Sequence, residues 1–407
     1  MGKPLAIRPP GASYVRTRPC LHPGLAASSG DRHDPPRLTV IVPAFNESLR
    51  LAEGARRFAA AVEGGQLCPA STELIVVDDG STDETASRAE ELLAETFPRL
   101  RVLRLHENAG KGAAVRLGTA AATAPVVLFM DADMSVDPTE IPRLVKVIGP
   151  ADVAIGSRSL TDSVVEIDGM QRRIMGKTFN VMVSALTKMP FRDTQCGFKA
   201  FRTPLARLLF HLMQAQRFAF DVEVLSLARQ LGMEITEVAV HWREVGHSRV
   251  RTLVDPLSMT REVLNLTTRR QWPHTPALAV TPGAGERRRT RSRIVNELHR
   301  ALGPNFPILI SPEDQLLVLL PLCGPVEVQQ MAARVRELQI ELVVRERSIS
   351  FSQLTDLAPF KWIDGEDNGL VVAARGDVSN LVSYMPTDGW ESVRSNQGQN
   401  STGTLSS

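Results

Sequence analysis

Short apolar runs alternate with helical segments through the first third of the 407-residue chain. The runs at 38–43, 73–77 and 101–105 each lead into a loop, and a helix is expected after each loop. A fourth run, 126–130, has five consecutive apolar residues. Short apolar runs bounded by turn residues are typical of strands that are buried on both faces. Strands and helices that alternate in this way predict a mostly parallel sheet with right-handed crossovers, and therefore an α/β fold.

The fourth run ends in two carboxylates, Asp131 and Asp133, with Ala132 between them. In open α/β sheets, ligands bind beyond the carboxyl ends of the strands. Two acids at this spacing can share one hard divalent cation, either Mg²⁺ or Mn²⁺, and the small Ala132 leaves its approach uncrowded. The pair alone is weak evidence, because many strands end in an exposed Asp that merely begins a turn.

Two other acidic groups stand at or just past the ends of neighbouring predicted strands: Glu47, and the pair Asp78 and Asp79. A carboxylate can accept a hydrogen bond from the ring N–H of a base, or from the hydroxyls of a ribose. A metal at the acid pair would neutralise a diphosphate and assist its departure. In the alternative reading, Asp78 and Asp79 are only turn and cap residues. Because acids recur at successive strand ends, we favour a pocket for a nucleoside diphosphate.

Seven motifs that occur in order between residues 38 and 252 resemble glycosyltransferase family 2. They are TVIVPAFNE, ELIVVDDGSTDET, NAGKGAAVRLG, VVLFMDADMS, AIGSRS, DTQCGFKAF and FAFDVEVL. Within the family, the likeness is greatest to the dolichyl-phosphate glucosyltransferases, with the polyprenyl-phosphate mannosyltransferases as near relatives. The resemblance implies a nucleotide-binding α/β fold of the GT-A type, an inverting mechanism, and a divalent cation at the D-x-D.

The resemblance also implies which residues hold the nucleotide sugar. By motif, the nucleoside is expected to contact Pro43, Phe45, Glu47, Val77 and Asp79. The ribose, diphosphate and metal would be bordered by Asp131, Ala132 and Asp133. Lys111, in a Gly-Lys-Gly loop that lacks the spacing of a Walker motif, is expected on the donor side. One departure is Ser135, because mannosyltransferase relatives place Gln there; water can fill that position around Mg²⁺.

Three arginines and one acid complete the expected site. A lipid monophosphate is largely a dianion at neutral pH, since its second pKa is about 6, so it needs positioning and no general base. Arg158, in the GSR motif, and Arg172, on the next helix, are assigned to the acceptor phosphate, because guanidinium groups suit its geometry. Arg249 is assigned to the donor diphosphate; the alternative is an exposed surface arginine. Asp221 is expected to orient sugar hydroxyls; the alternative is an acid that merely favours a helix start.

Composition divides the chain into five parts. We expect disorder at 1–36, the GT-A domain at 37–270, a basic linker rich in Pro, Gly and Arg at 271–293, a small α/β domain at 294–392, and a disordered tail at 393–407. A hydrophobic content of 43% and a charged content of 23% are typical of a soluble globular protein. The net charge of +2 gives no argument for a nucleic-acid partner.

Neither a membrane span nor a signal peptide is evident from the sequence, because no apolar run approaches about 20 residues. We therefore expect a cytoplasmic protein, with the option of a peripheral position on the cytoplasmic face of a membrane. The basic segment 287–293 could bind anionic lipid at about 1 kcal/mol per basic residue; the alternative is a solvated linker.

The sequence thus predicts a hexosyltransferase that moves glucose from UDP-glucose to a polyprenyl phosphate of the dolichyl type and releases UDP. Three alternatives stay open at this point. The donor can be GDP-mannose, the acceptor can be something other than a lipid, or the domain can be a nucleotide-sugar-binding module without catalytic activity.

Overall fold

The computed structural model describes residues 36–166, 186–187, 189–244, 272–282, 291–303, 305–310, 316–338, 342–357, 361–363 and 371–373. Within these ranges the chain forms two units, built on a seven-stranded sheet and a six-stranded sheet, together with a small two-stranded ribbon. The structural statements that follow concern this described part of the chain.

The first sheet has the strand order β3-β2-β1-β4-β7-β5-β8. Its strands are β1 (Leu38–Ala44), β2 (Thr72–Asp78), β3 (Leu100–Arg104), β4 (Val126–Met130), β5 (Val153–Ser157), β7 (Phe198–Arg202) and β8 (Ile235–Ala239). β1 to β4 pair in parallel, which confirms the predicted parallel core. β7 runs antiparallel to both β4 and β5, so the sheet is mixed. Because Met130 pairs with Phe198, the start of β7 lies beside the end of β4.

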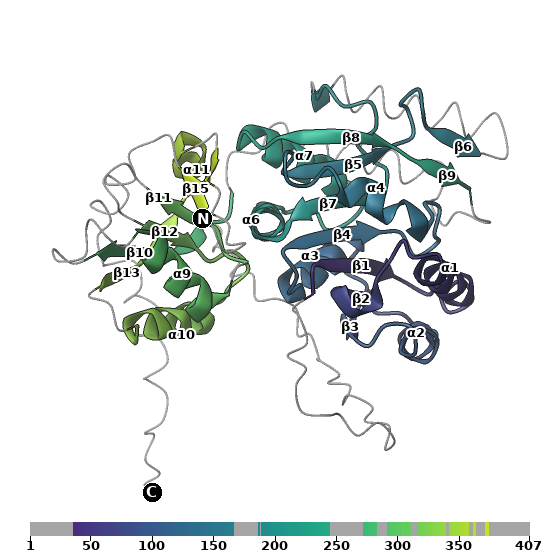
Figure 1. Ribbon diagram of the computed structural model, residues 1–407, viewed down its shortest axis with the longest axis horizontal. Coiled ribbons are helices and arrows are strands. Elements are labelled where there is room, and N and C mark those ends of the chain that lie inside the picture. Colours follow the sequence, from purple (N-terminus) through teal and green to yellow (C-terminus); the bar gives the residue numbers. More distant parts are fainter. Residues whose placement is uncertain are drawn as a thin grey trace, which may run out of the picture.

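Helices cover both faces of this sheet (Figure 1). They are α1 (Leu51–Glu63), α2 (Thr85–Leu93), α3 (Lys111–Ala121), α4 (Ile141–Val145), α6 (Thr203–Leu212) and α7 (Phe220–Gln230), with short 3-10 turns η1 (Pro69–Ser71) and η2 (Pro138–Glu140). α1, α2 and α4 share one core with the side chains of Leu128 and Met130. α3, α6 and α7 share another with Val127 and Phe129. Successive residues of a strand point to opposite faces, so β4 is buried on both sides, as its apolar run predicted.

Beyond the first sheet, β6 (Val164–Glu166) pairs in parallel with β9 (His241–Arg243) as a two-stranded ribbon. The ribbon joins the first unit through the isolated bridge between Val136 and Trp242. It therefore extends the carboxyl-end side of the sheet, where the predicted ligand residues stand.

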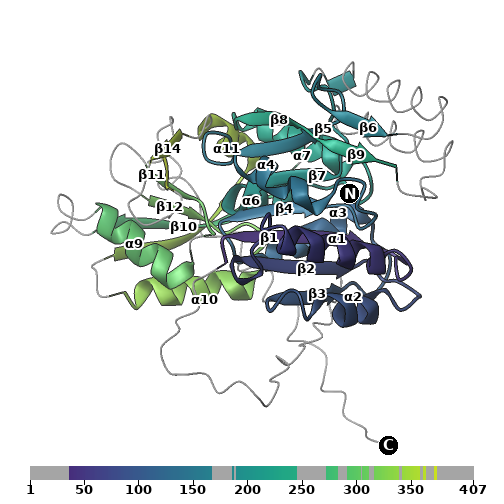
Figure 2. The same ribbon diagram turned by 45° about the vertical axis from the view of Figure 1, so that its right-hand side comes forward.

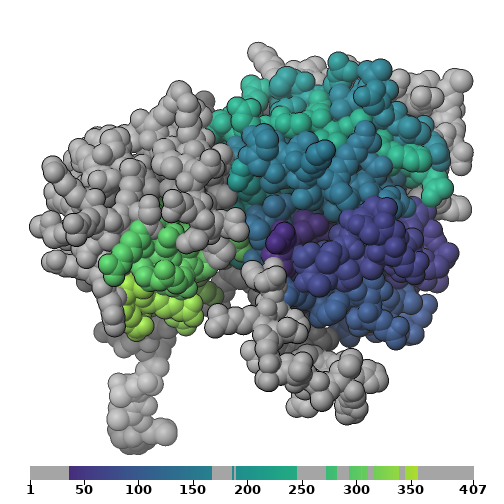
Figure 3. Space-filling model, in the orientation of Figure 1, coloured from purple at the N-terminus to yellow at the C-terminus, as the bar shows by residue number. Residues whose placement is uncertain are grey.

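The second sheet has the order β13-β10-β12-β11-β15-β14. Its elements are β10 (Thr275–Pro282), α9 (Arg291–Leu302), β11 (Ile308–Ile310), β12 (Leu316–Leu319), α10 (Pro325–Arg336), β13 (Leu342–Ile349), α11 (Phe351–Leu357), β14 (Lys361–Ile363) and β15 (Val371–Ala373). α9 and α10 pack on one face of it. Figure 3 shows these helices in green and yellow-green at the surface beside the first unit.

The predicted linker at 271–293 is wrong in one part, because residues 275–282 form β10, which pairs with β12 and with β13. Residues 277–280 are all buried, so this short apolar run is an inner strand of the second sheet. The Pro and Thr residues at both of its ends gave it the composition of a linker. The helix α9 also begins inside the predicted linker, at Arg291.

Helix α6 lies between the two sheets (Figures 1 and 2). Its buried residues share a core with Ala277 and Leu317 of the second sheet. At its end, His211 is bonded through Nε2 to the His274 carbonyl oxygen, at 2.9 Å, and accepts through Nδ1 from the Leu322 N–H, at 3.2 Å. The two units are therefore packed against each other through a common apolar core. None of the described helices is long and apolar enough to cross a membrane.

Candidate active site

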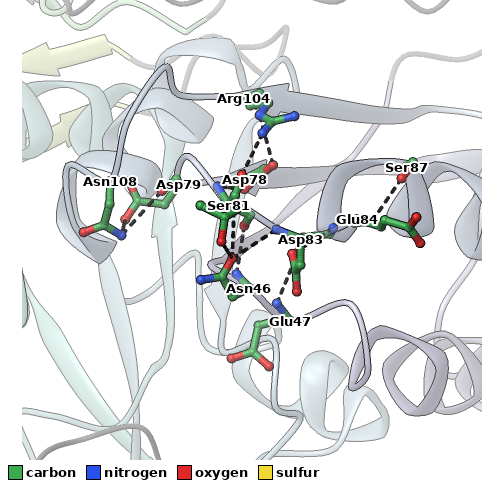
Figure 4. Close-up of polar contacts among 12 residues, drawn as sticks. Asn46, Glu47, Asp78, Asp79, Ser81, Asp83, Glu84, Ser87, Arg104 and Asn108 are labelled. Atoms are coloured by element: carbon green, nitrogen blue, oxygen red, sulfur yellow. Dashed lines mark hydrogen bonds and ion pairs between the residues drawn. The ribbon is translucent and has the colours of Figure 1, made fainter.

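Two loops at the carboxyl ends of β1 and β2 are joined by hydrogen bonds (Figure 4). The Asn46 N–H donates to Ser81 Oγ and the Glu47 N–H donates to Thr85 Oγ1, both at 2.8 Å. In return, Asn46 Oδ1 accepts from the Thr82 N–H at 2.8 Å. Asn46 has a φ of 52°, a left-handed conformation that Asn tolerates better than most residues. These bonds set the position of the loop that carries Phe45 and Glu47.

The expected nucleoside residues lie on this joined edge of the sheet. Pro43 and Val77 are paired in register between β1 and β2, and both are buried. Phe45 is 37% exposed. The Glu47 side chain is 12% exposed, and its Oε2 lies 3.4 Å from Arg50 Nη1. An aromatic face and a carboxylate are therefore presented beside the ends of two strands.

The two acids where β2 ends, Asp78 and Asp79, have different structural roles. Asp78 Oδ1 accepts from the Ser81 N–H at 2.8 Å, so Asp78 closes the turn. Asp79 accepts from Asn108 Nδ2, from the Ala109 N–H and from the Gly110 N–H (Figure 4). Burial raises the pKa of Asp79, although these backbone hydrogen bonds oppose the rise. Asp79 thus holds the loop that leads into α3. A nucleoside that binds here would contact a carboxylate that already accepts these hydrogen bonds.

The acid pair stands at the end of β4, as predicted. Asp131 Oδ1 lies 2.5 Å from Lys111 Nζ, at the first residue of α3. Asp133 Oδ1 accepts from the Ser135 N–H at 2.9 Å, and Ala132 between the two acids is buried. Burial, followed by the charge of Asp131, raises the pKa of Asp133. For Lys111, burial alone would lower the pKa, but nearby carboxylates, led by Asp131, outweigh it and raise the pKa.

This arrangement fits a hard divalent cation with two protein ligands. Burial, and after it the charge of Asp131, disfavours ionisation of Asp133, and a dication would relieve the repulsion between the two carboxylates. No group of three or more His, Cys, Asp or Glu residues with metal-ligand geometry occurs in the described part of the chain. Mg²⁺ in phosphate-transfer sites is often held by one or two carboxylates, with water and substrate phosphates in the other positions.

A buried lysine that the sequence analysis missed lies behind the acid pair. Lys199 has a side chain that is 0% exposed, and its Nζ lies 2.5 Å from Asp221 Oδ1. Asp221, expected to orient sugar hydroxyls, is therefore paired inside the protein and is only 4% exposed. The sequence did contain a signal for this residue. A lysine that stands between two phenylalanines in a mostly apolar strand indicates a buried, paired charge.

Arg158 follows β5, and its guanidinium is held by one carboxylate. Its Nε and Nη2 donate to Asp193 Oδ2 and Oδ1 at 2.6 Å and 2.9 Å, and its backbone N–H donates to Oδ2 at 3.0 Å. Burial acts to raise the pKa of Asp193, but the charge and hydrogen bonds of Arg158, together with the Gln195 N–H, outweigh it and lower the pKa. The guanidinium carbon also lies 5.6 Å from the Trp242 ring centroid. The other two predicted arginines, Arg172 and Arg249, lie outside the described residues.

Two further buried groups have structural tasks. Glu223 accepts from the N–H groups of Gln214 and Ala215, at 3.1 Å and 2.6 Å, and so holds the segment between α6 and α7. Burial raises the pKa of the Cys196 thiol to about 12. The thiol is therefore neutral near pH 7, which supports packing over nucleophilic catalysis as its role.

Comparisons with known proteins show which family this chain resembles. The family model described as Glycosyl transferase family 2 matches residues 39–209. Dolichyl-phosphate beta-glucosyltransferases of Dictyostelium discoideum and Drosophila melanogaster are 34% and 38% identical, over 56% of this chain and 73% of each of those proteins. The human protein of the same name is 33% identical over 56% of this chain and 74% of its own length.

Among solved structures, glucosyl-3-phosphoglycerate synthase from Mycobacterium tuberculosis, in complex with Mn²⁺, UDP and phosphoglyceric acid, is similar with a TM-score of 0.42 and 22% identity. The match covers 57% of this chain and 77% of that one.

Proposed function

Because this chain belongs to glycosyl transferase family 2, we propose that it transfers glucose from UDP-glucose to a polyprenyl phosphate of the dolichyl type and releases UDP. The chain is a glycosyltransferase, and the substrates are the part that we infer. They follow from the relatives of 33–38% identity, which are named as dolichyl-phosphate beta-glucosyltransferases.

The observation that carries the proposal is the grouping of Asp131, Asp133 and Lys111 where β4 ends and α3 begins. A divalent cation bound by the two acids would neutralise the diphosphate and make UDP a better leaving group. The Lys111 ammonium adds a fixed positive charge on the same side of the site. Phe45 and Glu47 offer a ring and a carboxylate to the nucleoside, next to the paired residues Pro43 and Val77.

The acceptor side needs positive charge and no general base. A phosphate monoester is largely a dianion at neutral pH, so one of its oxygens can attack the anomeric carbon directly once it is positioned and desolvated. A single displacement of this kind inverts the configuration at that carbon. We assign the acceptor phosphate to Arg158, which Asp193 holds in one orientation, and to Arg172. Arg249 is assigned to the donor diphosphate.

The test is incubation of the purified full chain with labelled UDP-glucose, a short polyprenyl phosphate, and Mn²⁺ or Mg²⁺. Label should pass into the organic phase and depend on the cation, and chelation should stop it. Asp133→Ala should abolish this transfer, whereas Asp162→Ala, at an exposed acid in the loop after β5, is the matched control. A parallel arm with GDP-mannose decides the donor. If no donor gives an organic-phase product, the proposal is wrong.

We further propose that the chain reaches a lipid acceptor by binding the membrane surface through its basic segment, 287–293. Sedimentation with anionic vesicles should fall when the arginines at 287, 288, 289, 291 and 293 are replaced by glutamine. Unchanged sedimentation would refute this role of the segment.

A further inference from the structure

Lys199 is a fully buried ammonium group that the proposed reaction does not use. It lies in β7, between Phe198 and Ala200, and its side chain is 0% exposed. Burying a charge is unfavourable unless the charge is paired and hydrogen-bonded. The groups that contact this ammonium therefore indicate its role.

The ammonium is held by groups from three parts of the first unit. Nζ lies 2.5 Å from Asp221 Oδ1 at the start of α7, and it donates to the Cys196 carbonyl oxygen at 2.7 Å. It also lies 5.5 Å from the centroid of the Phe129 ring in β4. An ammonium has three N–H donors, and here they face a carboxylate, a carbonyl oxygen and an aromatic ring. Lys199 thus links α7 to the turn that precedes β7.

That turn touches the acid pair. Met130 and Phe198 are paired in register, so Gly197 stands beside Asp131. A Cβ atom on Gly197 would lie 2.1 Å from Asp131 Oδ2, so any side chain there would have to displace the carboxylate. The Asp131 carboxylate is therefore held between two groups, with the Lys111 ammonium at Oδ1 and the Gly197 backbone beside Oδ2.

We propose that Lys199 is a positioning residue: by joining Asp221 to the Cys196 carbonyl, it holds the turn at Gly197 against Asp131 and so fixes the carboxylate for the cation. This inference rests on the assignment of the cation to Asp131 and Asp133 in the proposed function. A buried ion pair is often replaceable by apolar residues without loss of stability, so stability alone does not explain it. Groups that orient metal ligands from behind typically contribute 10- to 100-fold to metal affinity.

The test is the double variant Lys199→Met with Asp221→Leu, which removes both charges together. Binding of Mn²⁺ is measured in the presence of UDP, from the loss of the free-ion electron paramagnetic resonance signal. UDP is used because it lacks the sugar, so a role of Asp221 toward sugar hydroxyls does not affect the result. We expect an affinity about 10- to 100-fold weaker than that of the wild type, with a thermal midpoint of the metal-free protein within a few degrees of it. Wild-type affinity in a folded double variant would overturn the proposal.

Two further variants keep the test decisive. Gly197→Ala displaces the Asp131 carboxylate directly and leaves Lys199 paired, so it should weaken Mn²⁺ binding with UDP as well. If the double variant does not fold, unchanged binding in Gly197→Ala overturns the proposal. The control is Glu73→Gln, which disturbs a buried acid paired with Arg101 at the opposite end of β2. It should lower the thermal midpoint and leave Mn²⁺ binding unchanged.

The outcome also separates this inference from the proposed function. A wild-type protein that binds Mn²⁺ with UDP, loses that binding in these variants, and transfers no sugar to lipid would refute the proposed substrates. The positioning role of Lys199 would stand in that case.

Discussion

Replacing Arg158 by methionine should destabilise the protein strongly, because it leaves Asp193 as a buried carboxylate without its counter-ion. The Asp193 side chain is 1% exposed, whereas that of Arg158 is 31% exposed. Two side-chain hydrogen bonds, at 2.6 Å and 2.9 Å, would be lost. Two backbone donors would remain, because the N–H of residue 158 donates to Asp193 Oδ2 at 3.0 Å and the Gln195 N–H donates to Oδ1 at 3.1 Å.

The size of the effect follows from this burial. Breaking a buried ion pair by removing one partner typically costs about 3–5 kcal/mol. Because the guanidinium is partly exposed and two backbone donors to Asp193 remain, we expect the lower end, about 3 kcal/mol. For a domain of roughly 150–250 residues, each kcal/mol shifts the thermal midpoint by about 2–4 °C, so the midpoint should fall by about 6–12 °C.

The pH dependence gives a second readout with a defined sign. The pKa of Asp193 is lower in the folded protein than in the unfolded chain, so the pair adds stability above the unfolded pKa of about 3.9. That stability is lost as the pH falls through the folded pKa. The difference between wild type and Arg158→Met should therefore be full near pH 7 and shrink below about pH 4.

Thermal and urea unfolding of the metal-free proteins measure both effects. Arg88→Met is the matched control, because its ion pair with Glu91 is exposed on both sides and should be worth less than about 1 kcal/mol. An Arg158→Met midpoint within about 2 °C of the wild type would refute the structural role. Arg158 would then be free to act on the acceptor phosphate alone.

Three further substitutions probe other parts of the molecule. Gly110→Ala should lower the unfolding free energy by about 1–3 kcal/mol in urea titrations, since φ is 107° and a Cβ would lie 2.6 Å from the Gln216 carbonyl oxygen. Phe306→Ala should cost about 3–5 kcal/mol and shift one common unfolding transition, because the 5% exposed ring contacts Arg207 across the two units; two separate transitions would contradict the shared core. Asp133→Asn should raise the metal-free thermal midpoint near pH 7 and abolish the further rise on adding Mn²⁺ with UDP. The raised pKa of Asp133 means that its ionised form costs stability, so the gain should vanish as the pH falls below the unfolded pKa of about 3.9.

The strands of the first sheet and the acids at their ends could be predicted because each depends on a few neighbouring residues. The run Val126–Met130 is apolar throughout and is buried on both faces. Because this strand ends at Met130, Asp131 and Asp133 lie just beyond the edge of the sheet. The antiparallel pairing of β7 with β4 could not be predicted in this way, because it joins residue 130 to residue 198, which are 68 positions apart in the chain.

The sequence pattern did not predict helix α6, and it placed strand β10 in a linker, for a shared reason. Eight of the ten residues of α6 are buried, and its polar stripe is only Arg207 and His211, which is narrower than the polar face of a typical surface helix. β10 has a short apolar centre between Pro and Thr residues, the composition of a connecting segment. Both are buried because the two units pack together, and that packing is a tertiary property that neither local pattern contains.

The partners that neutralise each acid of the site could not be predicted from the sequence, because they come from distant segments of the chain. Among the described acids at the strand ends, Asp79 is satisfied largely by backbone N–H groups, and Asp131 faces Lys111. Asp133 is different, because burial and the charge of Asp131 raise its pKa despite the opposing charge of Lys111, and its contact with Ser135 adds no positive charge. Much of the electrostatic gain from a dication should therefore arise at Asp133, since Asp131 already has a cationic partner. For that reason, loss of the Asp133 carboxylate should lower the affinity for the cation more than loss of the Lys111 ammonium, although Lys111 makes a short contact with Asp131.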